Sequence, residues 1–218
     1  MKNASTKKGF TLIEMIVSIA IFVATLFVVM SAFLAIIDGD HKSRGLRIAT
    51  DNLNLSLEDM TRKIKTGSSY NCTGASSGTA DCTAAPSSIF SFTGQDGVSR
   101  IIYKRGVGSG AIVNGVGASG CGNAVFSATQ GCILREDLGF LPMLATSPEV
   151  DVTSLKFYVS GSAPCGTSPC VSLPPVTDQK QPMMVVVVDG SLGVSTVAFV
   201  GNAGFKIQTA ITQRAYDN

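Results

Sequence analysis

The sequence predicts an α+β protein in which one long N-terminal helix packs on a mainly antiparallel β-sheet head. Three observations predict this fold: residues 10–37 are almost all apolar, residues 46–64 carry an apolar stripe at helical spacing, and short β-rich runs follow Gly67 between turn-forming residues. With 218 residues, the chain has room for one folded domain and an anchor.

Residues 10–37 are expected to cross a membrane as a helix. Glu14 is their only charged residue, and about 20 apolar residues are enough to span a bilayer core. A secretory signal fits poorly, because its apolar region has only about 7–15 residues before a small-residue cleavage site. A carboxylate at the bilayer centre costs about 2.5–3.5 kcal/mol and by default marks a function. The alternative is a plain signal anchor with an unimportant glutamate.

Residues 8–14, Lys-Gly-Phe-Thr-Leu-Ile-Glu, resemble the type III signal of type IV prepilins and type II secretion pseudopilins. The resemblance implies a leader with the basic residues Lys7 and Lys8 on the cytoplasmic side of the inner membrane. A membrane prepilin peptidase would cut this leader after Gly9. The same enzyme would then methylate the new N-terminus, Phe10.

The same resemblance implies a role for Glu14 in assembly, by pairing with the free amine of a neighbouring subunit. The physics agrees, because an amine and a carboxylate that meet between packed helices compensate each other's desolvation. Glu14 lies four residues after Phe10, so it is also placed to neutralise the amine of its own chain.

For the whole chain the resemblance implies a minor pilin-like subunit that joins other pilins or pseudopilins in a filament, at initiation or at the tip. The head is larger than a repeating shaft subunit usually carries. Residues 14–22 also resemble J-type minor pseudopilins, and pili, type II secretion and DNA uptake all stay open. The alternative is a signal-anchored extracytoplasmic binding or adhesive protein that keeps its leader and never polymerises.

The net charge gives no reason to expect a nucleic-acid partner. The whole chain has 17 basic and 15 acidic residues, but Lys2, Lys7 and Lys8 lie in the expected leader. Without these three, 14 basic residues face 15 acidic ones, a net charge of −1 before the terminal groups.

The cysteines indicate disulfides in an oxidising compartment, because their number is even and all follow the apolar run. They therefore predict a head outside the cytoplasm. Fifteen pairings are possible, and we favour the sequential one. No Cys-x-x-Cys occurs and His41 is the only histidine, which argues against a metal site. The cysteines are Cys72, Cys82, Cys121, Cys132, Cys165 and Cys170.

Residues 38–66 are expected to extend the helix as an amphipathic half that lies on the head. Ile48 and Leu55 point away from its stripe, among charged residues. They are either isolated exposed residues or contacts with the helix of a neighbouring subunit. The stripe consists of Leu46, Ala49, Leu53, Leu57, Met60 and Ile64.

The end of the helix is predicted from charge pairs and a cap. Glu58 with Arg62, and Asp59 with Lys63, are spaced four apart with the acid first, which is the favourable orientation. Gly67 is a plausible C-terminal cap. The expected parts are thus a leader at 1–9, a membrane half at 10–37, an amphipathic half at 38–66 and the head at 67–218.

Within the head, residues 88–92 and 98–104 are expected to form a hairpin around a Gly-Gln-Asp-Gly turn. Residues 183–188 are continuously apolar, which predicts a central strand buried on both faces. A variable segment at 67–86 should join the helix to the sheet. The other expected strands are 132–136, 152–160, 194–200 and 205–212.

No motif predicts an enzyme, a cofactor or a metal. The glycine-rich residues 106–122 lack the flanking strand and helix of a nucleotide loop. His41 has no nucleophile pattern near it, and a solvated helix residue is expected. Four acids that could in principle help to bind calcium form no spaced loop: Asp137, Glu149, Asp151 and Asp189.

Overall fold

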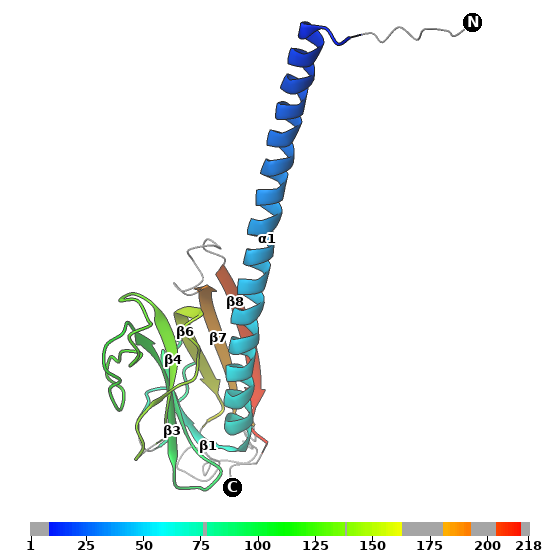
Figure 1. The fold of residues 1–218 in the computed structure, drawn as a ribbon. Coiled ribbons are helices and arrows are strands. Elements are labelled where there is room, and N and C mark those ends of the chain that lie inside the picture. Colours follow the sequence, from blue (N-terminus) through cyan, green and yellow to red (C-terminus); the bar gives the residue numbers. More distant parts are fainter. Residues whose placement is uncertain (1–8, 76–77, 138, 163–180, 193–203, 215–218) are drawn as a thin grey trace, which may run out of the picture.

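A single helix, α1 (Leu12–Thr66), runs through both the membrane half and the amphipathic half without a break. The computed structural model describes residues 9–75, 78–137, 139–162, 181–192 and 204–214. Figure 1 shows the upper half of α1 projecting away from the strands and its lower half lying against them. The helix passes through Gly39 and Gly45, which the sequence offers as possible soft points, without interruption.

The strands form two antiparallel sheets, which confirms the α+β prediction. A five-stranded sheet has the order β1-β2-β3-β4-β5, and a three-stranded sheet has the order β6-β7-β8. The strands are β1 (Ser68–Asn71), β2 (Ile89–Thr93), β3 (Arg100–Val107), β4 (Gly131–Asp137), β5 (Met143–Leu144), β6 (Val150–Ser160), β7 (Met183–Leu192) and β8 (Gly204–Thr212).

The β2–β3 hairpin is present as predicted, closed by the Thr93–Arg100 pair. The carboxylate of Asp96 accepts hydrogen bonds from the backbone N–H groups of Val98 and Ser99, at 3.1 and 2.9 Å. Gly97 has φ +70°, a conformation that glycine adopts without strain. The Ser99 hydroxyl also donates to this carboxylate, and this bond together with the two backbone N–H bonds holds the pKa of Asp96 below its usual value.

Strands β4, β6 and β8 also lie where the sequence predicts strands. In β6 a register shift between Val152 and Ser154 moves Leu155 onto the buried face, which explains the interval of three between Val152 and Leu155. The predicted strand at 194–200 lies outside the described residues. The segment expected to join helix and sheet contributes β1, which adds one edge to the larger sheet.

The prediction for β7 is half wrong. It is the central strand of its sheet, but only one of its faces is buried. Met184, Val186 and Val188 point into the core, while Val185 and Val187 are only partly buried on the other face. The two-sheet arrangement is the reason, because the described elements cover the smaller sheet on one side only.

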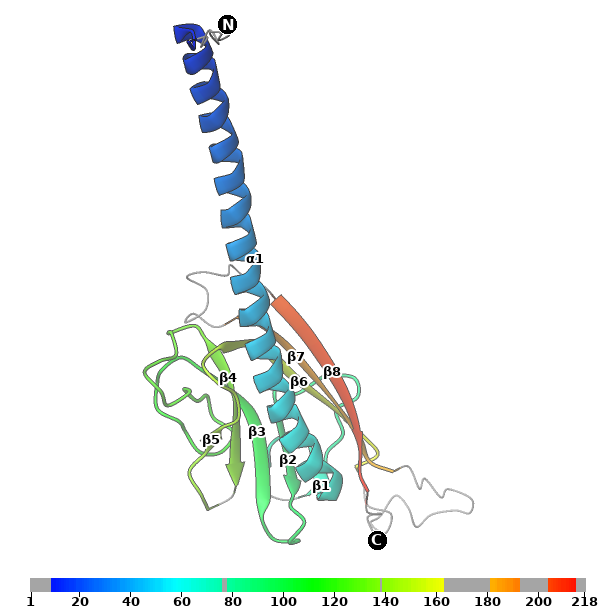
Figure 2. The same cartoon turned by 45° about the vertical axis from the view of Figure 1, so that its right-hand side comes forward.

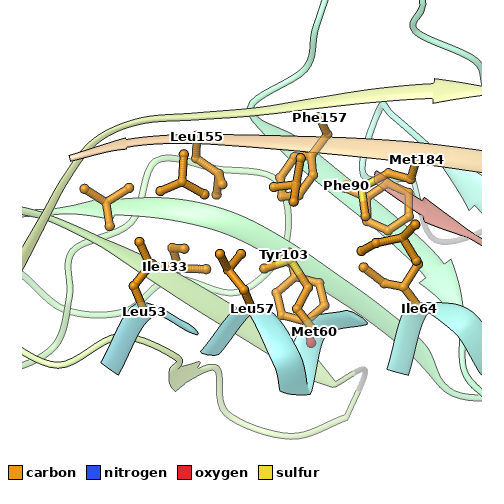
Figure 3. Packing of buried hydrophobic residues seen from close by; sticks show 14 of the residues in the cluster. Leu53, Leu57, Met60, Ile64, Phe90, Tyr103, Ile133, Leu155, Phe157 and Met184 are labelled. Atoms are coloured by element: carbon orange, nitrogen blue, oxygen red, sulfur yellow. The ribbon is translucent and has the colours of Figure 1, made fainter. Parts of the chain in front are cut away.

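The core lies between the amphipathic half of α1 and the two sheets. Figure 3 shows Leu53, Leu57, Met60 and Ile64 pointing from the helix toward side chains of both sheets, including Phe157 and Met184. The stripe differs from the prediction at its start: Leu46 is 37% exposed, and burial begins at Gly45 and Ala49. The sheet side of the core includes Phe90, Tyr103, Ile133, Leu155, Phe157 and Met184.

The end of α1 is closed by packing rather than by a left-handed glycine. Gly67 has φ −88° and ψ 170°, an extended conformation open to any residue, and its N–H donates to the Ile64 carbonyl. A Cβ at this position would lie 2.3 Å from Phe92 Cδ2 and 2.8 Å from the Thr93 carbonyl oxygen. Gly67 is thus the C-cap of α1, as predicted, and glycine is required there because β2 approaches so closely.

One of the two charge pairs expected on α1 is replaced by a tertiary contact. Glu58 pairs with Arg62 at 3.3 Å as predicted. Asp59 instead pairs at 3.1 Å with Arg135 of β4, whose side chain is only 17% exposed. A partner held by a sheet competes better than a free lysine on the helix surface, since its side-chain entropy is already lost.

Shortening Leu53 should weaken the head by removing its most central helix contact. Leu53 is fully buried, and Leu→Ala at such a site costs about 2–5 kcal/mol. Leu55→Ala, a matched change at a position that is 69% exposed, should alter the free energy of unfolding by less than about 0.5 kcal/mol. Urea denaturation of the purified full chain in detergent measures both. Equal losses in the two variants would contradict the packing described.

Candidate functional site

The chain enters α1 through a short exposed segment that contains the expected cleavage point. Gly9 and Phe10 are exposed and belong to no helix or strand. A Cβ built on Gly9 would meet no atom within 4 Å. The bond between these residues is therefore accessible, two residues ahead of the helix. Lys7 and Lys8 lie outside the described residues.

Glu14 occupies the first turn of α1, at the third helical position. Thr11 is the N-cap, with φ −79° and ψ 150°, and its side-chain oxygen accepts a hydrogen bond from the Glu14 N–H at 3.4 Å. Thr-x-x-Glu is the spacing of a capping box, in which the acid at this position faces the free N–H groups of the helix start. Reasoning about the membrane missed this local motif, although its spacing is visible in the sequence.

The upper half of α1 is exposed all around its circumference. Its most apolar window has a mean hydropathy of 2.8 and no buried residue, so by length and composition it can cross a membrane. Its hydroxyl groups are satisfied within the helix: Ser18, Thr25 and Ser31 each donate to the carbonyl three residues earlier, at 2.8–2.9 Å. The hydroxyl donors on this half of the helix therefore need no water as a partner. A lipid environment requires this, because it offers polar groups no water.

Ile48 and Leu55 are exposed, on the helix half that lies on the head. Ile48 is 48% exposed. Leu55 lies at the rim of a shallow hollow beside Ser56, and β5 contributes Met143, which is 50% exposed. The Ser56 hydroxyl donates to the carbonyl of Ala145, which also lines the hollow. This hydrogen bond holds the segment after β5 against α1.

Two of the three expected disulfides are present in the described residues. Cys72 is bonded to Cys82 and Cys121 to Cys132. The first holds the segment after β1 against β6, where the Cys82 N–H donates to the Val159 carbonyl at 2.9 Å. The second joins the glycine-rich segment to β4. Cys165 and Cys170 lie outside the described residues.

The glycine-rich segment is held by a buried ion pair. Lys104 and Glu136 lie on neighbouring strands, with side chains 2% and 5% exposed and 3.5 Å apart. The Lys104 ammonium donates to the carbonyls of Val113 and Gly115. Glu136 accepts the Gly115 N–H with both oxygens, at 2.9 and 2.7 Å. Both charges and the loop backbone satisfy one another, which fits a structural role.

Three of the four candidate acids of the head make structural contacts. Asp137 pairs with Arg135 and Asp189 with Lys206, at 3.2 and 3.4 Å. Asp151 accepts the Gly131 N–H at 2.8 Å. The candidate acids thus lie at separate places, and the described residues contain no group of three or more metal-ligating side chains.

Tyr103 is the most perturbed ionisable group outside the membrane half. Burial, and to a lesser degree the Asp59 carboxylate, raise its pKa, so the phenol stays neutral at physiological pH. Its ring stacks on Phe92 with centroids 6.2 Å apart. His41 is exposed on α1. Neither residue lies beside a nucleophile arrangement in the described part of the chain.

The comparisons with known proteins agree with the N-terminal geometry. A family model described as the prokaryotic N-terminal methylation motif matches residues 4–36, which include Gly9, Phe10 and Glu14. The match does not confirm the J-type likeness. No curated protein and no solved structure matches the chain. The methylation motif, the apolar helix that follows it and the antiparallel head together support a relationship to prepilin-type pilins and pseudopilins.

Proposed function

We propose that this protein is a minor pilin-like subunit, made as a membrane-anchored prepilin and then assembled through α1 into a type IV pilus or a type II secretion pseudopilus. The methylation motif at residues 4–36 carries this proposal. The exposed apolar half of α1 supports it, because a helix that projects this far beyond its head needs either lipid or other helices around it. The subunit acts in initiation or at the tip and is not an enzyme.

In this proposal a prepilin peptidase removes residues 1–9 at the inner membrane and methylates Phe10. Residues 10–37 then serve as the membrane and assembly half, residues 38–66 as the amphipathic half, and residues 67–218 as the extracytoplasmic head. The exposed bond after Gly9 supports the first step. The disulfides of the head support its location, because such bonds persist in oxidising compartments.

Glu14 takes part in assembly by pairing with a methylated N-terminal amine, from a neighbouring subunit or from its own chain. Its place in the first turn of α1 brings the carboxylate to the helix end where that amine is created. An unpaired charge among apolar helices is energetically costly. Either pairing therefore favours the insertion of α1 among the packed helices of the filament. The competing proposal, a signal-anchored binding or adhesive protein, gives Glu14 only its capping role.

The N-terminus of the mature protein distinguishes these two functions. Protein extracted from membranes of cells with active prepilin peptidase should begin at Phe10 and carry one added methyl group, as measured by intact mass. Gly9→Val should keep residues 1–9, whereas Gly39→Ala, a glycine change within α1, should be processed normally. An intact Met1 in the unmodified protein would overturn the pilin-like function.

Two substitutions separate the charge of Glu14 from its role as a cap. Glu14→Ala and Glu14→Gln should both be cleaved, yet both should fail to enter filaments, because each removes the charge. Gln retains the capping interaction, so normal assembly of Glu14→Gln alone would show that capping suffices. Glu58→Gln, an exposed acid on the same helix, is the control. Filament fractions probed for the subunit give the measurement.

Ile48 and Leu55 are proposed to contact the helix of a neighbouring subunit. They are seven residues apart, on one side of α1, and both are exposed. Changing both to Glu should reduce filament incorporation several-fold while leaving the melting temperature of the purified chain unchanged, because neither side chain belongs to the core. Phe140→Glu with Leu141→Glu, at two exposed head positions, is the matched control. Incorporation at the unmodified level would refute the contact.

A further inference from the structure

Strand β8 is an edge strand, and no other described strand pairs with its outer side. It pairs with β7 alone, at one end of the order β6-β7-β8. Figures 1 and 2 both show β8 alongside α1, and in Figure 2 it is the outermost coloured element on its side of the head. A strand in this position presents a row of backbone donors and acceptors.

The register identifies which backbone groups face outward. The Gln213 N–H donates to the Pro182 carbonyl at 3.0 Å, one pair beyond Met183 and Thr212. Backbone groups alternate in direction along a strand, so those of Thr212 and of every second residue before it point away from β7. Within the described part of the chain, no backbone hydrogen bond from another element reaches them. These outward-facing residues are Lys206, Gln208, Ala210 and Thr212.

Arg214 is the next residue whose backbone faces away from β7. There the neighbour is α1, so the open edge ends at this point. The Arg214 N–H donates to the Lys65 carbonyl of α1 at 2.9 Å. The open edge therefore spans seven residues, from Lys206 to Thr212, and its lower end adjoins the last turn of α1. A segment that pairs with this edge would also lie next to the helix.

Cations stand at both ends of the open edge. Lys206 lies at the upper end, with a side chain 69% exposed and 3.4 Å from the partly buried Asp189. Lys65 and Arg214 line a hollow at the lower end, together with Thr66. An edge lysine normally discourages strand pairing, but here Asp189 neutralises part of its charge. The two other cations favour an approaching segment with acidic side chains.

We propose that the free edge of β8 accepts an extended acidic segment of an adjacent subunit of the same filament as an added strand. Backbone hydrogen bonds from the four outward-facing residues provide the pairing, and Lys65, Lys206 and Arg214 select acidic side chains. The choice of a filament subunit as the partner rests on the proposed function. In that function α1 packs against neighbouring subunits, and the lower end of the β8 edge adjoins the last turn of α1. The pairing itself does not depend on that function.

Proline at position 210 tests the edge without breaking the sheet. The Ala210 N–H faces outward, so Ala210→Pro removes a donor that the β7 ladder does not use, and proline is tolerated at such edge positions. Ala210→Ser changes the same exposed residue and keeps the donor. Thr209→Pro removes a donor that faces β7 and should lower the melting temperature, which checks the assignment of directions. Circular dichroism of the full chain in detergent measures all three.

The pairing is detected by photocross-linking in cells, with p-benzoylphenylalanine in place of Gln208. An adduct with another pilin-type subunit should form in the unmodified and Ala210→Ser backgrounds. It should fall about tenfold or more in Ala210→Pro, since an unpaired backbone group opposes binding. Arg214→Glu should also reduce the adduct, whereas Leu141→Glu, at an exposed head position between β4 and β5, should not.

The outcomes distinguish the pairing from the proposed function. An undiminished adduct in a folded Ala210→Pro protein, or no adduct in folded protein that has entered filaments, would overturn the pairing. An adduct only with a protein that is not a pilin-type subunit would overturn the choice of partner. If residues 1–9 are retained and a proline-sensitive adduct still forms, the pairing stands and the proposed function fails.

Discussion

Burial of one helical stripe, Ala49 to Ile64, determines the architecture of this protein. Five side chains of α1 enter a core that both sheets share, and this contact makes a rigid connection between the head and a helix of 55 residues. The glycine at the helix end lets β2 approach closely, and the Asp59–Arg135 pair adds a polar contact beside the apolar ones. The upper half of α1 has no comparable partner within the described chain. It is therefore the part that must be solvated by lipid or by other helices.

The two ends of α1 perform different physical tasks. At its start, the Thr11 side chain accepts the Glu14 N–H, and the Glu14 carboxylate lies in the first helical turn. At its end, Gly67 and the Lys65–Arg214 hydrogen bond connect the helix to one strand of each sheet. The helix continues through residues 39 and 45, so no break in helical structure separates these two ends.

The head combines a well-anchored loop system with an unprotected edge. Two disulfides and the buried Lys104–Glu136 pair hold long segments that contain few backbone hydrogen bonds of their own. Stability in these segments comes from cross-links, because their glycine-rich sequences bury little apolar surface. The β8 edge is different, since it is regular and uncharged in its middle. That contrast between fixed loops and an open strand is the reason to regard β8 as the place where the head meets another chain.

The sequence by itself determined the long helix, the methylation motif and most strands, because each depends on local spacing. It favoured the two described disulfide pairs but left other pairings open. It also contains the capping-box spacing of Thr11 and Glu14, of which the structure shows the Glu14 N–H donating to the Thr11 side chain. Only the tertiary structure decided that Asp59 pairs with Arg135, that Leu46 stays partly exposed at the start of the stripe, and that the described elements cover β7 on one side. Each of these depends on residues far apart in the chain. An apolar run shows that a strand is buried, but the number of layers around it is set by how two sheets and a helix meet.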